Sequence, residues 1–146
     1  MQASIAALDD HSVARVSLDL PLRANLSALD NIALIPLYQR HFSAAESGQQ
    51  AMALLDQLGH GNIASLRDPD MTVPQRFVTK LARALILQRT RLVIDRPGAM
   101  LYDVAYPLFI QQLAARMASD KRWEMYDYTW NRALYPADLA SQPEPA

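Results

Sequence analysis

The chain has 146 residues, with 14 lysines and arginines against 15 aspartates and glutamates, so its formal net charge is −1. This length predicts one domain, and a hydrophobic content of 51% is enough to bury a core. The near-neutral charge gives no electrostatic support for nucleic-acid binding, and the absence of cysteine excludes disulfides and a cysteine nucleophile. Because no apolar run reaches the roughly 20 residues that span a bilayer and no secretory leader is recognisable, we expect a cytoplasmic protein without direct membrane insertion.

The first third of the chain predicts a lead-in, a strand and a short helix. Residues 1–12 have a loose or weakly helical pattern. From Val13 to Leu20, apolar and polar side chains alternate, which is typical of a half-buried strand that Pro21 ends. The apolar stretch from Leu26 to Leu37 predicts a short helix that stops before Pro36, because proline disfavours helical backbone at the residue before it.

Two capping boxes mark the clearest helix starts. Ser43 stands three residues before Glu46, a spacing that lets the two residues satisfy each other's free backbone N–H groups. This spacing predicts a helix over about 44–58, which Gly59 ends in a left-handed conformation.

The second capping box, Thr72 to Gln75, predicts a helix with Pro74 in its first turn. Apolar residues at helical spacing predict its buried stripe, and cations share the other side. A solvated face is favoured for these cations, and a site for phosphate or an acidic partner is the alternative. The stripe comprises Phe77, Leu81, Ala84 and Leu85, and the cationic face comprises Arg76, Lys80 and Arg83.

The last third of the chain predicts a strand and a helix. The apolar run Leu92–Ile94 ends in a Pro97–Gly98 turn and predicts a buried, parallel-type strand. A helix is predicted over about 104–118. The aromatic segment from Trp123 to Tyr135 is ambiguous between strand and helix, and residues 141–146 read as a flexible tail.

The order of these elements, from about Leu26 to Pro97, resembles the ATPases of ABC transporters. The segment from Met71 to Gln75 lies where that family carries its Leu-Ser-Gly-Gly-Gln signature, and Leu81-Ala-Arg-Ala-Leu85 matches the helix that follows it. The segment from Leu92 to Pro97 lies where the Walker B strand and its Asp-Glu-Pro end are found. The segment from Leu26 to Leu34 is most similar to the ATPases of Mce-type lipid transport systems.

The departures from the family's pattern argue against ATP hydrolysis. None of the four glycines stands in a Walker A motif, the loop on which the family holds nucleotide phosphates. Val73 and Pro74 replace the two signature glycines, which allow close backbone approach to phosphate. Arg96 replaces the carboxylate that polarises the attacking water. The degenerate signature therefore comprises Met71, Thr72, Val73, Pro74 and Gln75, and the degenerate Walker B motif comprises Asp95 and Arg96.

Other family positions are also altered. Tyr102 stands where the D-loop aspartate is expected, with Asp103 one place further on, and Tyr128 stands where the switch histidine is expected. The Q-loop glutamine falls near Leu18.

Some residues admit two interpretations. Asp95 either binds Mg²⁺ as a Walker B aspartate does or caps the Pro97–Gly98 turn, and the turn is favoured. The aromatic residues from Trp123 to Tyr135 form either a recognition surface or part of the core.

The three histidines lack metal-ligand spacing, so we expect no metal site and no cofactor.

We therefore expect an α/β, predominantly helical fold. It is a truncated ABC-ATPase-like domain over residues 1–140, with a helical subdomain and a small remnant of a parallel-type sheet, followed by the flexible tail 141–146. The resemblance and its departures imply a catalytically inactive protein, not an enzyme, that acts as a binding or regulatory subunit of an ABC transport system of lipid type.

The resemblance implies a protein partner, which is a permease, an intact ABC ATPase or a second copy of the chain. The apolar and aromatic residues Leu37, Tyr38 and Phe42 are the candidate contact. Two alternatives stay open. In one, the chain contributes in trans to the ATPase site of an intact partner; in the other, it is a self-contained helical interaction domain unrelated to transport.

Overall fold

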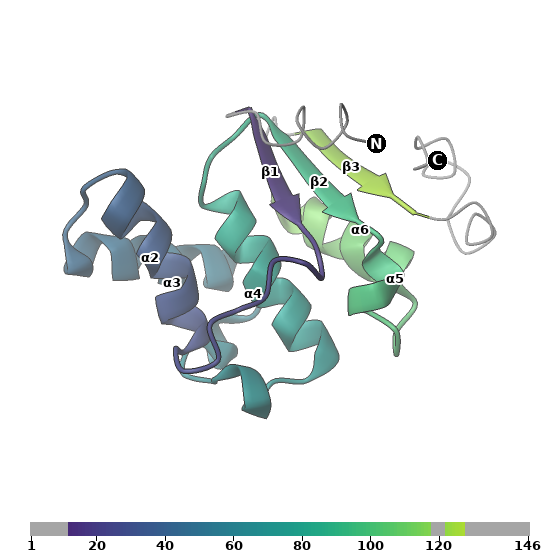
Figure 1. The fold of residues 1–146 in the computed structure, drawn as a ribbon, viewed down its shortest axis with the longest axis horizontal. Coiled ribbons are helices and arrows are strands. Elements are labelled where there is room, and N and C mark those ends of the chain that lie inside the picture. The colour runs from purple at the N-terminus through teal and green to yellow at the C-terminus, as the bar shows by residue number, and fades with distance from the viewer. Residues whose placement is uncertain (1–11, 118–121, 128–146) are drawn as a thin grey trace. The chain divides into compact units, whose positions relative to one another are not determined.

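The computed structural model describes residues 12–117 and 122–127 (Figure 1). The chain divides into two compact units, of which unit 1 comprises Met1–Asp19 with Arg89–Ala146 and unit 2 comprises Leu20–Gln88. The single domain over 1–140 stays a prediction. The predicted tail 141–146 and residues 1–11 of the predicted lead-in lie outside the described residues. In the described part of the chain, no helix has both the length and the apolar composition for a membrane crossing.

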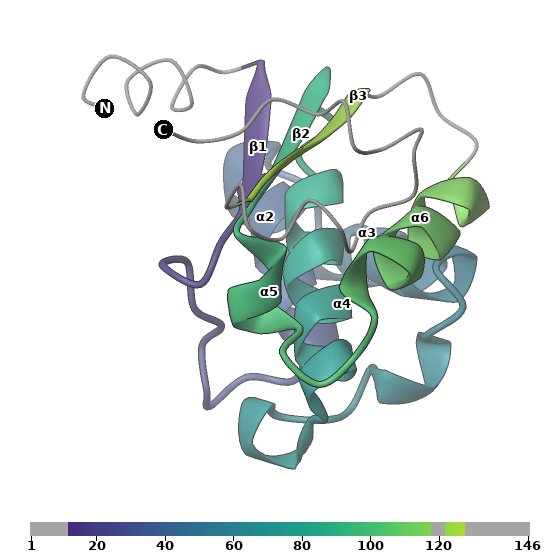
Figure 2. The same ribbon diagram turned by 90° about the vertical axis from the view of Figure 1, so that its right-hand side faces the viewer.

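Unit 1 contains a three-stranded parallel sheet in the order β1-β2-β3. Its strands are β1 (Val13–Val16), β2 (Arg91–Asp95) and β3 (Arg122–Tyr126), which lie side by side in Figure 1 and in the perpendicular view of Figure 2. The register places Arg91 beside both Val13 and Arg122. The apolar centre of β2 is fully buried, which confirms the predicted parallel-type strand.

Strand β1 is shorter than its sequence pattern predicts. It ends at Val16, and Leu18 and Leu20 beyond it are exposed by 56% and 38%, so the predicted strand to Leu20 is wrong. Neighbouring side chains of a strand point to opposite faces of the sheet. Because Val13 and Ala14 are both buried, β1 is covered on both faces and is not the half-buried strand that its pattern predicts. The ladder with β2 stops at the pair of Val16 with Ile94, although β2 itself continues to Asp95 beside β3.

Two helices lie between β2 and β3 in the sequence of unit 1. The longer, α6 (Tyr106–Arg116), confirms the helix predicted over 104–118 and buries Tyr106, Ile110 and Leu113. The shorter, α5 (Pro97–Met100), corrects the predicted Pro97–Gly98 turn. A proline fits the first position of a helix because its missing N–H has no partner there in any helix.

Unit 2 consists of α2 (Ala28–Gln39), α3 (Ala44–Gln57) and α4 (Val73–Leu85), joined by short 3₁₀ helices η1 (Gly61–Ile63) and η2 (Asp68–Asp70). Helix α2 packs against both α3 and α4. Large apolar side chains on these helices and the connecting segment are fully buried and form the core of the unit: Ile32, Leu55, Leu58, Ile63, Phe77 and Leu81.

The capping box of α3 is confirmed. The Ser43 hydroxyl accepts from the Glu46 backbone N–H at 3.1 Å, and the Glu46 carboxylate accepts from the Ser43 N–H at 3.4 Å. Gly59 follows the helix with a φ of 80°, the left-handed conformation that glycine adopts at lowest cost.

Helix α2 differs from its prediction at its carboxyl end. It continues to Gln39 with Pro36 inside it, so the predicted stop before Pro36 is wrong. The last turn still closes, because the carbonyl of Pro36 accepts from the N–H groups of Arg40 at 3.1 Å and Phe42 at 3.3 Å. A proline near the end of a helix therefore removes one hydrogen bond without ending the helix at once.

Candidate functional site

The amino-terminal end of α4 carries the degenerate signature. The Thr72 N–H donates to the Gln75 side-chain oxygen at 2.9 Å, and the Gln75 N–H donates to the Thr72 hydroxyl at 3.3 Å, which confirms the second capping box. Pro74 has no N–H to donate. The backbone donors of the first turn, which form an anion site at many helix starts, are thus largely used or missing here.

Met71 of the signature and Arg76, which follows it, make the contacts that hold the signature loop in place within unit 2. Met71 is buried, and its sulfur lies 3.7 Å from the Thr79 hydroxyl, which also lies 2.9 Å from the Gln75 carbonyl oxygen that accepts from it. The Arg76 guanidinium forms an ion pair with the Asp68 carboxylate, with Nε 2.6 Å from Oδ1, and also donates to the Asp68 carbonyl at 2.9 Å. Arg76 therefore holds η2 against α4.

The cationic side of α4 is not the solvated face that its sequence predicts. Lys80 is only 5% exposed. The Arg83 guanidinium donates to the carbonyls of Pro21, at 2.8 Å, and of Leu20. Burial lowers the pKa of Arg83 from its ordinary value. For Arg83 the prediction fails because the segment that begins at Leu20 accepts hydrogen bonds from its guanidinium, a contact between residues 62 and 63 positions apart that helical periodicity does not reveal.

The end of β2 carries the degenerate Walker B motif. The Arg96 guanidinium forms an ion pair with the carboxylate of its neighbour Asp95. A terminal nitrogen and Nε of Arg96 donate to Oδ2 of Asp95 at 3.1 Å and 3.3 Å. The same guanidinium lies 3.5 Å from the carboxylate of Asp19, which follows β1. The Arg96 backbone N–H donates to the Tyr126 carbonyl at the end of β3 at 2.6 Å. Arg96 thus connects the carboxyl-terminal ends of all three described strands.

The backbone of Arg96 is left-handed, with φ 48° and ψ 65°. This conformation costs an arginine about 1–2 kcal/mol, because its Cβ approaches the following carbonyl oxygen. Its contacts with Asp95 and Tyr126 offset that cost. Helix α5 begins with no side-chain cap, so the interpretation of Asp95 as a cap for this turn is wrong.

A divalent cation does not fit the residues at this edge. Mg²⁺ binds oxygen ligands and repels cations at close range. The Asp95 carboxylate, which a metal would need, is already bonded to a guanidinium that is protonated at all physiological pH values. Across residues 12–117 and 122–127, no group of three or more histidine, cysteine, aspartate or glutamate side chains has the geometry to hold a metal ion.

A buried pair beside this edge is not evident in the sequence. The Tyr106 hydroxyl donates to the Asp127 carboxylate at 2.5 Å, and both residues are buried. Gly98 packs closely against the Tyr106 ring, because a Cβ at this glycine would lie 3.3 Å from a ring carbon. The available sequence signal for Asp127 is its position directly after a strand, since parallel strands end at one edge of a sheet.

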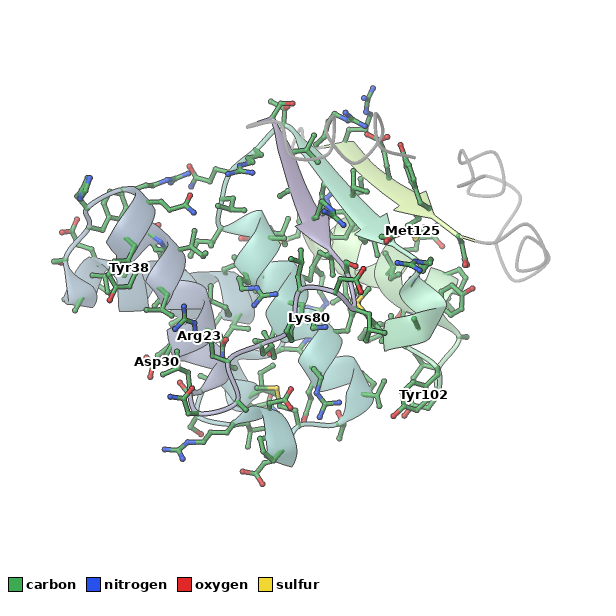
Figure 3. The ribbon with its side chains drawn as sticks, in the orientation of Figure 1. Arg23, Asp30, Tyr38, Lys80, Tyr102 and Met125 are labelled. Atoms are coloured by element: carbon green, nitrogen blue, oxygen red, sulfur yellow. The ribbon has the colours of Figure 1, made fainter. Side chains whose placement is uncertain are left out.

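The candidate partner residues lie on and just after α2. Tyr38, labelled in Figure 3, is 71% exposed, whereas Leu37 and Phe42 are half-buried. Tyr102, at the D-loop position, is 75% exposed. Tyr128, at the switch position, lies outside the described residues.

No family model matches the chain. It is 30% identical over 89 residues to the lipoprotein-releasing system ATP-binding protein LolD of Psychrobacter arcticus (strain DSM 17307 / VKM B-2377 / 273-4), a match that covers 60% of this chain and 39% of the relative. Its fold is similar to that of the dimeric ATP-binding cassette MJ0796, with a TM-score of 0.67 and 20% identity over 90% of this chain and 58% of the cassette. It is also similar to an ABC transporter of metal-chelate type in an inward-facing conformation, with a TM-score of 0.63 and 22% identity over 80% of this chain and 48% of the other.

These similarities confirm the predicted fold class, with its helices and small parallel sheet. The chain spans less than two thirds of the length of the curated relative and of the cassette. The resemblance to Mce-type ATPases stays a prediction. The chain therefore has the fold of ABC-ATPase cassettes, and 89 of its residues are similar in sequence to part of an ATP-binding protein of a lipoprotein-releasing system.

Proposed function

We propose that this chain is a catalytically inactive ABC-ATPase-like domain that acts as a binding or regulatory subunit of an ABC transport system. The observation that carries this proposal is the ion pair between Arg96 and Asp95 at the end of β2. The resemblance assigns Asp95 to the family's magnesium-binding position and Arg96 to the position of its water-polarising carboxylate. Arginine is always protonated in proteins, so it accepts no proton from water.

The signature position supports the same conclusion. Close approach of a helix start to phosphate depends on free N–H donors and on small side chains. At this position Val73 and Pro74 both carry side chains, and the capping box uses the N–H groups of Thr72 and Gln75. These features also disfavour the alternative in which the loop completes the ATPase site of an intact partner.

The proposed partner is a permease, an intact ABC ATPase or a second copy of the chain. The matched relative LolD is the ATP-binding protein of a lipoprotein-releasing system, and MJ0796 is dimeric in its structure. The lipid type of the transport system, including the Mce type, is part of this proposal and rests on the resemblance of the segment from Leu26 to Leu34. In this proposal the chain works on the cytoplasmic side and reaches the inner membrane only through its partner.

The candidate contact is the surface formed by Leu37, Tyr38 and Phe42. A tyrosine that is 71% exposed presents a large apolar area with little entropy to lose, which is typical of residues that dominate interface affinity. We therefore expect Tyr38 to contribute most of the affinity of this surface.

Hydrolysis measurements test the proposed inactivity. Purified chain is incubated with Mg-ATP, and phosphate release is compared with that of the Asp95→Asn variant. We expect both proteins to release phosphate at the rate of the protein-free blank. Phosphate release above the blank that disappears in Asp95→Asn would contradict the proposal.

Co-purification tests the proposed partner. The chain is co-expressed in turn with the ABC permease and with the intact ABC ATPase of its own organism, as wild type and with Tyr38→Ala and Phe42→Ala combined. We expect recovery of one component to fall about tenfold or more in the double variant. The matched control is Leu108→Ala, which removes a 51% exposed apolar side chain from α6. Equal recovery with the wild type and the double variant would contradict a contact through this surface.

A further inference from the structure

The carboxyl-terminal edge of the sheet in unit 1 collects charge from all three described strands. Asp19 follows β1, Asp95 ends β2, and the carbonyl of Tyr126 ends β3. All three accept from one residue, Arg96: the carboxylates from its guanidinium, and the carbonyl from its backbone N–H. The carboxylates of Asp19 and Asp95 therefore share one guanidinium at this edge, and the buried carboxylate of Asp127 directly follows β3 and accepts from Tyr106.

Arg96 is held in place from both its backbone and its side chain. Its left-handed conformation, with φ 48°, is one that few residues other than glycine and asparagine adopt readily. The 2.6 Å bond from its N–H to Tyr126 joins this residue to β3, and the guanidinium bonds of 3.1 and 3.3 Å join it to Asp95. These contacts fix the cation on Asp95, whose side chain is only 20% exposed.

We infer that the Arg96 guanidinium is the resident cation of this edge and keeps divalent ions off Asp95. This inference deepens the proposed function and rests on its assignment of Asp95 to the family's magnesium-binding position. A divalent ion reaches Asp95 only by displacing the guanidinium, because two cations on one carboxylate repel each other strongly when water is partly excluded. The chain therefore supplies from its own sequence the positive charge that a metal would bring.

Titration with Mn²⁺, followed by the loss of its free electron paramagnetic resonance signal, tests this inference without nucleotide. The main variant is Arg96→Asn, because asparagine is neutral and tolerates the left-handed backbone. Arg96→Gly is a second variant that also removes the guanidinium while relieving the backbone. The charge-matched control is Arg122→Asn, which removes a 68% exposed cation from the same unit without touching Asp95.

We expect Arg96→Asn and Arg96→Gly to bind Mn²⁺ about tenfold more tightly than the wild type and Arg122→Asn. We expect the gain to disappear when Asp95→Asn is added to either variant. The inference is overturned if neither Arg96 variant gains affinity over Arg122→Asn, or if the gain survives Asp95→Asn.

The two proposals fail in different experiments. Equal Mn²⁺ affinity in all variants would overturn the role of Arg96 and leave the proposed inactivity supported by Val73 and Pro74. Phosphate release from Mg-ATP by the wild type would contradict the proposed inactivity, while the Mn²⁺ comparison would still report whether Arg96 occupies Asp95.

Discussion

Replacing Glu124 by glutamine should destabilise the sheet of unit 1 by removing a charge that two arginines share. Arg91 and Arg122 lie directly opposite each other in the register of β2 and β3. The Glu124 carboxylate accepts from Arg91 at 2.7 and 3.1 Å and from Arg122 at 3.2 Å. Like charges in directly opposed positions repel, so the carboxylate offsets a repulsion that the sheet register imposes.

The expected magnitude follows from these bonds. A glutamine keeps one oxygen as an acceptor and places an NH₂ group against an arginine donor, so one charge-assisted bond of the pair with Arg91 is lost. Such a bond contributes about 1.5–3 kcal/mol. Because the Arg91 side chain is 30% exposed, water hydrates the freed N–H, and we expect a loss of about 1–2 kcal/mol. Arg122→Ala is the control, because its side chain is 68% exposed and its pair with Glu124 contributes less than about 1 kcal/mol.

The effect should depend on pH. The hydrogen bond from Arg91 lowers the pKa of Glu124 below its ordinary value, and the same bond raises the pKa of Arg91. A carboxyl whose pKa is lower in the folded state contributes stability above its unfolded pKa of about 4.3, and this contribution is lost as the pH falls through the lower folded value. The difference between the wild type and Glu124→Gln should therefore be full at pH 7 and narrow as the pH falls below about 4.

Urea unfolding followed by circular dichroism, at neutral and at acidic pH, measures this difference. A Glu124→Gln variant that unfolds at the wild-type urea concentration at pH 7 would refute the reasoning. A difference from the wild type that stays constant into acid would also refute it, because the lowered pKa of Glu124 requires the difference to shrink.

Three further substitutions test other parts of the structure by the same urea measurement. Leu81→Ala removes a fully buried side chain of α4 and should cost about 2–5 kcal/mol; a cost near zero would show that this position is not in the core of unit 2. Thr72→Ala removes the hydroxyl that caps α4 and should cost about 1 kcal/mol, and an unchanged midpoint would contradict the capping geometry. Tyr106→Phe removes the hydroxyl that donates to the buried Asp127 carboxylate and should cost about 1–3 kcal/mol, whereas a neutral substitution would argue against this bond.

Features that depend on neighbouring residues were predictable from the sequence. The capping boxes at Ser43 and Thr72 need only residues three apart, and both are present. The buried strand β2 follows from an apolar run too short for a helix. The order of these local features was also enough to identify the ABC-ATPase resemblance that the fold confirms.

Features that depend on distant residues were not predictable. The contacts of Arg83 depend on where the segment that begins at Leu20 lies, which helical periodicity does not encode. The sequence of strand β1 alternates as far as Leu20, but the strand ends at Val16, where its pairing with β2 ends. The placement of Arg96 on Asp95 depends on a left-handed backbone that no sequence rule assigns to arginine.

In the proposed function, the Arg96–Asp95 ion pair and the side chains of Val73 and Pro74 at the signature position leave the chain without a site that binds Mg-ATP. Isothermal titration of the purified full chain with Mg-ATP, alongside Asp95→Asn, measures this property most directly. We expect no heat of binding at millimolar nucleotide and no difference between the two proteins. Saturable binding of ATP that requires magnesium and is lost in Asp95→Asn would contradict it.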